Sequence, residues 1–184
     1  MKKQSKLKIV EFAYTLFHKN GYQATSMSDI ANAVGMTKAG LYHHFESKEA
    51  ILLAVLEMVK GYMEKSLFSL AYDEELDVMN RLQAFVREQK EILLANRGAC
   101  FIGNMTLETG RLNEQNRALL NQIFKDWKKA LAFLYSHFHS SEVADVLAEQ
   151  TVIEFEGAVM LSQLGKNNSI ILDKAIKRAI ARAI

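Results

Sequence analysis

The segment from Thr37 to Lys48, TKAGLYHHFESK, gathers side chains that can bind nucleic acid. Lysine, threonine, tyrosine and histidine donate hydrogen bonds to phosphate oxygens and to base edges in the major groove of DNA. Ala39 and Gly40 are small enough to let a helix backbone come close to a duplex. The pattern predicts a DNA-contacting surface that comprises Thr25, Ser26, Thr37, Lys38, Ala39, Gly40, Tyr42, His43 and Lys48.

The predicted contacts divide into two kinds. Lys38 and His43 are expected to read base edges, because both can donate hydrogen bonds in the major groove. Thr25, Tyr42 and Lys48 are expected to contact phosphates. A lysine near the positive end of a helix is unfavourable by a few tenths of a kcal/mol, and a phosphate near Lys48 would compensate for this.

Two short helices and a tight turn are expected to position these side chains. Ser26 and Asp29 form an S-x-x-D variant of the capping box, which starts a first helix at Ser26. Gly35 suits the left-handed residue that ends such a helix. Thr37 is expected to cap a second helix over residues 38–45. Two helices joined by a glycine-containing turn are typical of a helix-turn-helix.

The stretch TSMSDIANAVGMTKAGLYHHFESKEAIL resembles the DNA-binding domain of the TetR family of transcriptional repressors. It follows the pattern T-x-x-x-x-I-A-x-x-x-G-[VM]-[ST]-K-x-x-L-Y-x-H-F-x-[ST]-K-[ED] almost without a break. IVEFAYTLFHKNGYQAT is similar to that family's first helix, and the similarity reaches about Val55. The remaining two thirds resemble the family only in length and helical organisation. The resemblance implies a homodimeric repressor that binds double-stranded DNA and is released by a small-molecule inducer.

Composition predicts the fold class and the domain division. The 184 residues include no proline, and most glycines separate apolar runs of helical periodicity, so we expect an all-α chain. A DNA-binding helix-turn-helix domain is expected over residues 1–48, with its first helix over 5–20, and a ligand-sensing and dimerisation domain over 49–184. Residues 1–50 carry seven lysines against four acidic residues, which suits a part that touches phosphates.

The sequence also predicts a location in the cytoplasm. The basic N-terminal residues are not followed by the apolar run of a signal peptide, and no stretch reaches the roughly 18 apolar residues that a membrane span needs. A single cysteine, Cys100, excludes an intrachain disulfide and fits a reducing compartment. We therefore expect no membrane partner.

Apolar and aromatic residues of the middle helices predict the inducer site. The predicted lining is Met58, Tyr62, Phe85, Gln89, Cys100, Met105, Phe124, Trp127 and Phe155, although such a set also suits an ordinary core. An alternative is a sensor of oxidants or electrophiles that acts through Cys100. The start of a short helix and the neighbouring Arg97 would lower the pKa of its thiol, whereas burial would raise it.

The last two helices, expected over residues 142–164 and 169–184, predict the dimer interface. Both carry apolar residues every three or four positions, and a glycine interrupts the first. The predicted interface is Gly157, Ala158, Leu161, Ile176 and Ala179. The alternative is that both helices pack only within their own chain.

No group of residues predicts catalysis, a metal site or a cofactor. His43 and His44 are adjacent, and His137 and His139 are two apart, which is poor spacing for a shared metal on a helix. We therefore expect neither an enzyme nor a bound cofactor. An enzymatic or lipid-binding body with a basic head is the alternative outside gene regulation, and a recognisable catalytic set would favour it.

Overall fold

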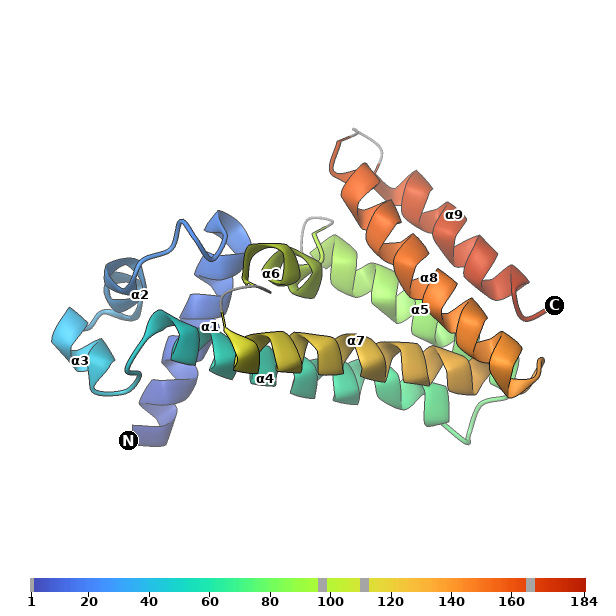
Figure 1. The fold of residues 1–184 in the computed structure, drawn as a ribbon, viewed down its shortest axis with the longest axis horizontal. Coiled ribbons are helices and arrows are strands. Elements are labelled where there is room, and N and C mark those ends of the chain that lie inside the picture. The colour runs from blue at the N-terminus through green and yellow to red at the C-terminus, as the bar shows by residue number, and fades with distance from the viewer. Residues whose placement is uncertain (1, 96–98, 110–112, 165–167) are drawn as a thin grey trace. The chain divides into compact units, whose positions relative to one another are not determined.

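The computed structural model describes residues 2–95, 99–109, 113–164 and 168–184. Every regular element within these ranges is a helix (Figure 1). The fold is all-α, as the sequence predicted. The helices form two compact units, which are described separately below.

The first unit comprises residues 1–61 and 101–121. Its core consists of side chains with no exposed surface from each of the early helices, such as Ile9, Ile30, Leu41 and Leu52. The elements of this unit are α1 (Lys2–Asn20), α2 (Met27–Val34), α3 (Lys38–Tyr42), the first part of α4 (Lys48–Ser66), α6 (Phe101–Thr109) and the start of α7 (Glu114–Tyr135).

This division differs from the predicted boundary after residue 48. The first part of α4 belongs to the first unit because its apolar face, including Ile51 and Val55, is completely buried. Helix α6 also belongs to it, because Phe101 packs against the ring of Tyr14 on α1 at a centroid distance of 4.9 Å. Neither contact is visible in the local sequence.

Two helix ends in the first unit differ from the predictions. Helix α1 starts at Lys2 rather than near residue 5. Helix α3 ends at Tyr42 rather than near residue 45, because the N–H of His44 bonds to the carbonyl of Leu41, three residues back, and tightens the chain into a turn. The predicted apolar pair remains on the buried side, since Leu41 and Phe45 are both buried.

The second unit comprises residues 62–100 and 122–184. Helices α8 and α9 lie side by side in it (Figure 1). Their bounds are shorter than predicted, and the suggested caps of α9 at Asn167 and its neighbours lie at the edge of, or outside, the residues whose side chains are described. The elements of this unit are the end of α4, the 3-10 helix η1 (Phe68–Tyr72), α5 (Val78–Ala95), the remainder of α7, α8 (Ser141–Ser162) and α9 (Asn168–Ala181).

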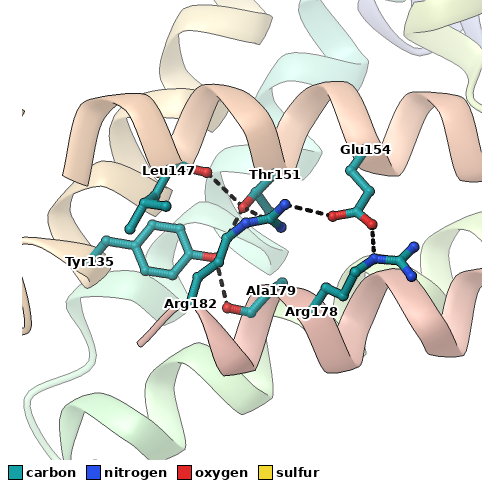
Figure 2. A network of polar contacts seen from close by, with 7 residues as sticks. All are labelled: Tyr135, Leu147, Thr151, Glu154, Arg178, Ala179 and Arg182. Atoms are coloured by element: carbon teal, nitrogen blue, oxygen red, sulfur yellow. Dashed lines mark hydrogen bonds and ion pairs between the residues drawn. The ribbon is translucent and has the colours of Figure 1, made fainter. Parts of the chain in front are cut away.

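A buried tyrosine joins three helices of the second unit (Figure 2). The hydroxyl of Tyr135 on α7 donates to the carbonyl of Ala179 on α9 at 2.9 Å and lies 3.1 Å from the Thr151 hydroxyl on α8. The Thr151 hydroxyl in turn donates to the carbonyl of Leu147 at 2.8 Å. These bonds satisfy polar atoms that would otherwise destabilise the core.

An ion-pair cluster continues this network toward the surface (Figure 2). Glu154 on α8 accepts from the guanidinium groups of both Arg178 and Arg182 on α9, the latter at 2.8 Å. Arg182 also donates to Thr151 at 3.2 Å. The carboxylate of Glu154 therefore has its countercharge within the same unit.

Candidate functional site

The predicted caps of helix α2 are confirmed. The Ser26 hydroxyl accepts the Asp29 N–H at 3.2 Å, and the Asp29 carboxylate accepts the Ser26 N–H at 2.8 Å. These bonds to Ser26 lower the pKa of Asp29. Gly35 adopts a φ of +78°, in the left-handed region that favours glycine, and ends the helix. The backbone then turns directly into α3.

Helix α3 presents the predicted DNA-reading side chains to solvent. Its first turn is held by the Thr37 hydroxyl, which accepts the Gly40 N–H at 3.1 Å. Leu41 is completely buried and anchors the opposite face. The exposed side chains are Thr37, Lys38, Ala39, Tyr42 and His43, with Ser26 exposed nearby on α2. The structure thus leaves this set accessible, while their contacts with DNA remain a prediction.

Thr25 and Lys48 are engaged inside the first unit rather than directed to solvent. Thr25 is 1% exposed, and its hydroxyl donates to the carbonyl of Gly21 at 2.7 Å. The Lys48 ammonium donates to the carbonyls of Tyr22 and Thr25, each at 2.8 Å, and lies 4.1 Å from the centre of the Tyr22 ring. The predicted phosphate contacts of these two side chains are therefore corrected: both brace the connection between α1 and α2.

Burial shifts the titration of this bracing cluster. The pKa of Lys48 is lowered by burial, and the carboxylates of Glu49 and Glu108 partly offset that shift. The Tyr22 hydroxyl donates to Glu49 at 3.0 Å. Burial and the negative charge of Glu49 raise the pKa of Tyr22 well above its usual range. Neither Lys48 nor Tyr22 is thus available as an acid or base near neutral pH.

Sequence reasoning missed a contact between α6 and the α1–α2 connection. The Gln23 N–H donates to the Glu108 carboxylate at 3.0 Å, and the Gln23 side chain donates to the Glu108 carbonyl at 3.3 Å. Gly21 has a φ of +83°, and a Cβ added there would lie 3.1 Å from the Glu108 carboxylate oxygens. The glycine ending α1 was the only sequence signal for a tight approach here.

The predicted inducer-site residues are divided between the two units. Met58 and Met105 belong to the first unit, and Met105 is 1% exposed. Tyr62 opens the second unit but is 52% exposed, so it does not line an interior site there. The others lie in the second unit, where Phe124 is half-buried and the remainder are buried: Phe85, Gln89, Cys100, Trp127 and Phe155.

Several buried polar atoms in the second unit lack a hydrogen-bond partner. Gln89 on α5 is 4% exposed, and neither end of its amide forms a hydrogen bond. The indole nitrogen of Trp127 on α7 and the Oε1 atom of Glu156 on α8 are likewise unpaired. Buried polar groups in folded proteins are normally paired, so each of these atoms calls for a ligand, a water or a second conformation.

Aromatic side chains surround one of these unpaired atoms. The Trp127 ring lies 6.1 Å from the ring of Phe124 and 6.4 Å from that of Phe155, measured between centroids. The Cys100 thiol bonds to the Glu156 carboxyl, while burial, the larger effect, raises the pKa of that carboxyl. Arg97, which was expected to activate the thiol, lies outside the described residues.

An exposed apolar stripe runs along α8. Gly157 lies within it, and a Cβ added there would meet nothing within 4 Å in this chain. Two predicted interface residues need correction, because Ala158 and Ala179 are buried within their own unit, and Ile176 is only half-buried. The large exposed apolar residues of the stripe are Val143, Val146, Ile153, Met160, Leu161 and Leu164.

Comparison with known proteins identifies the family. Residues 9–55 match the family described as bacterial regulatory proteins, tetR family. Residues 79–177, more than half of the chain, match the C-terminal domain of LmrA/YxaF-like transcriptional regulators. The chain belongs to the TetR family. The predicted family resemblance, made on the N-terminal third alone, is thus confirmed.

Relatives of this TetR-family regulator align over most of its length. The transcriptional repressor DhaR of Mycobacterium sp. strain GP1 is 28% identical over 86% of this chain and 82% of its own. The transcriptional regulator AcuR of Cereibacter sphaeroides is 28% identical over 79% of this chain and 70% of its own. A TetR regulator structure from Chloroflexus aurantiacus is 26% identical, with a TM-score of 0.83 over 98% of this chain and 94% of that one.

Membership of the TetR family assigns the helix-turn-helix to DNA binding in a transcriptional regulator. Within the described ranges, no three or more histidine, cysteine, aspartate or glutamate side chains are grouped so that they could hold a metal ion. None of the helices that the structure describes is long and apolar enough to cross a membrane.

Proposed function

We propose that this TetR-family regulator is a dimeric, cytoplasmic repressor that binds a palindromic operator and is released by a small-molecule inducer. The observation that carries the proposal is the exposed face of α3. It offers Lys38 and His43 as hydrogen-bond donors beside the small Ala39, on a short helix anchored by the buried Leu41. This face suits insertion into the major groove, where Lys38 and His43 read base edges.

The α8 stripe supports the dimer. Isolated exposed apolar residues are common, but a continuous row along one helix, with Ile153 and Leu161 each more than half exposed, marks an interaction surface. A second copy of the same stripe is its natural partner, because a two-fold interface joins identical patches. Two heads related by that axis read an operator with matching half-sites.

The unpaired polar atoms of the second unit support the inducer site. Gln89 and Trp127 are both more than nine-tenths buried, and a ligand would supply the missing hydrogen bonds. By the mechanism that the family implies, the inducer tilts α4 and separates the heads from their half-sites. The inducer acts only through its higher affinity for the released state.

Repression through Cys100 as a sensor is the alternative within the same family. The position of this thiol, 9% exposed and bonded to the Glu156 carboxyl, argues against it, because a nearby carboxylate opposes a second negative charge on sulfur. N-ethylmaleimide should therefore leave operator binding unchanged in both the parent protein and Cys100→Ser. Release of DNA in the parent alone would establish the sensor instead.

A gel-shift assay on the DNA upstream of the chain's own coding region tests the proposed function. Lys38→Ala and Tyr42→Ala should each weaken binding, and loss of a base contact should cost about 1–3 kcal/mol. Lys19→Ala and Tyr62→Ala serve as matched controls, because they remove the same side chains from exposed positions outside the helix-turn-helix. Parental binding by both α3 variants would refute the assignment of α3.

A further inference from the structure

Two glutamates on α8 have opposite surroundings. Glu154 is paired with Arg178 and Arg182 of α9, so its charge is neutralised within the unit (Figure 2). Glu156 is half-buried, and its Oε1 atom is buried with no hydrogen-bond partner. Its partner among the described residues is the neutral thiol of Cys100.

A carboxylate in this position is costly unless something supplies a positive charge. Removing an ionised carboxylate from water carries a penalty that a neutral thiol only partly offsets. The described residues form no ion pair with Glu156, and burial raises the pKa of its carboxyl. A cation beside Oε1 would remove this penalty.

The residues next to Glu156 are those that attract organic cations. Phe155, its neighbour on α8, packs against Trp127, which in turn lies beside Phe124. The faces of aromatic rings carry partial negative charge and attract ammonium groups, with tryptophan the strongest. A carboxylate beside aromatic rings therefore offers both a countercharge and an apolar surface.

We propose that the inducer of this regulator is a small organic cation, held by Glu156 and by the rings of Trp127 and Phe155. This inference rests on the proposed function, since it names the class of molecule that the inducer site takes. It excludes carboxylates and other anions, which Glu156 would repel. The unpaired Trp127 N–H adds a donor for a polar substituent on the same molecule.

Three ring compounds of similar size and different charge test the proposal: benzylammonium, benzyl alcohol and benzoate. Binding is measured without DNA, by calorimetry and by the emission of Trp127, which is the only tryptophan in the chain. Benzylammonium should bind at least about tenfold more tightly than benzyl alcohol, since a desolvated cation–π contact and a countercharge each favour the cation. Benzoate should bind least.

Two variants show whether Glu156 is responsible. Glu156→Gln should abolish the preference for benzylammonium over benzyl alcohol while leaving the affinity for the alcohol unchanged. Glu91→Gln removes the same charge from an exposed position on α5 of the same unit and should keep the preference. Equal affinities for the cation and the alcohol in the parent, or a preference that survives Glu156→Gln, would overturn the proposal.

The gel-shift assay separates this inference from the proposed function. A protein that binds its operator but shows no preference for the cation retains the repressor function and loses this proposal. A protein that prefers the cation but binds no operator retains the cation site and loses the proposed function.

Discussion

Gln23 and Glu108, 85 residues apart, are joined by two hydrogen bonds that run in opposite directions. The backbone N–H of Gln23 donates to the carboxylate of Glu108, and the side chain of Gln23 donates to the carbonyl of Glu108. Gly21, two residues before Gln23, leaves room for the carboxylate. Within the first unit, these contacts fix α6 to the connection that leads into the helix-turn-helix.

Replacing Glu108 should loosen this connection. Glu108→Ala should lower the free energy of unfolding by about 1 kcal/mol, because a net hydrogen bond is worth about that much and this one is solvent-exposed. Urea unfolding followed by circular dichroism measures the change. Glu11→Ala, at an exposed position on α1, should have no comparable effect. Equal stabilities of the two variants would mean that the bond contributes nothing.

The two left-handed glycines should respond differently to alanine. Gly35→Ala should cost about 1–2 kcal/mol from backbone strain alone, since nothing lies within 4 Å of the added Cβ. Gly21→Ala should cost more, because its Cβ also meets the Glu108 carboxylate. In the double variant Gly21→Ala with Glu108→Ala the excess should disappear, which a double-mutant cycle on unfolding free energies would detect. Strict additivity would exclude the contact.

Lys48 should matter for stability before it matters for DNA. Lys48→Met leaves the carbonyls of Tyr22 and Thr25 without their charged donor and should lower the unfolding free energy by about 1–2 kcal/mol. Lys65→Met, at an exposed position near the end of α4, is the matched control for thermal unfolding. Unchanged stability combined with weaker operator binding would restore the phosphate contact that the sequence predicted.

Gly157 tests the dimer more cleanly than the buried alanines do. Alanine at an interior helix position with open space around it should stabilise the isolated helix by about 1 kcal/mol, and Gly61→Ala on α4 meets the same conditions. If α8 approaches its symmetry mate at Gly157, only Gly157→Ala should weaken the dimer in sedimentation equilibrium, and Ile153→Glu should abolish it. Unperturbed dimers in both α8 variants would move the interface elsewhere.

Glu156 should give the protein a characteristic pH dependence. Because burial raises its pKa in the folded state, the native protein binds more protons than the unfolded chain between the ordinary pKa of 4.5 and the raised value. The contribution of Glu156 to the unfolding free energy therefore falls as pH rises through that window. Glu156→Gln should remove this part of the slope and be the more stable protein at neutral pH. Urea unfolding between about pH 4 and 8 measures it, and identical slopes would refute the shift.

Local bonds explain why the helix-turn-helix could be predicted in detail. Ser26 bonds to Asp29, and Thr37 bonds to Gly40, each within three residues, so the residues that make the caps lie together in the sequence. The left-handed Gly35 follows from its own lack of a side chain. The same reasoning misjudged the end of α3, where Leu41 holds a turn rather than a further turn of helix.

The sequence by itself determined the all-α fold, the TetR family and the exposed face of α3, because periodicity, caps and spacing are properties of neighbouring residues. Only the tertiary structure decided that Lys48 and Thr25 brace a connection, that Ala158 and Ala179 are core residues, and that α6 joins the first unit through Glu108. It also separated Glu154, neutralised by two arginines, from Glu156, which lacks such a partner among the described residues. The physical reason is that burial and countercharge depend on residues distant in the chain, which only packing brings together.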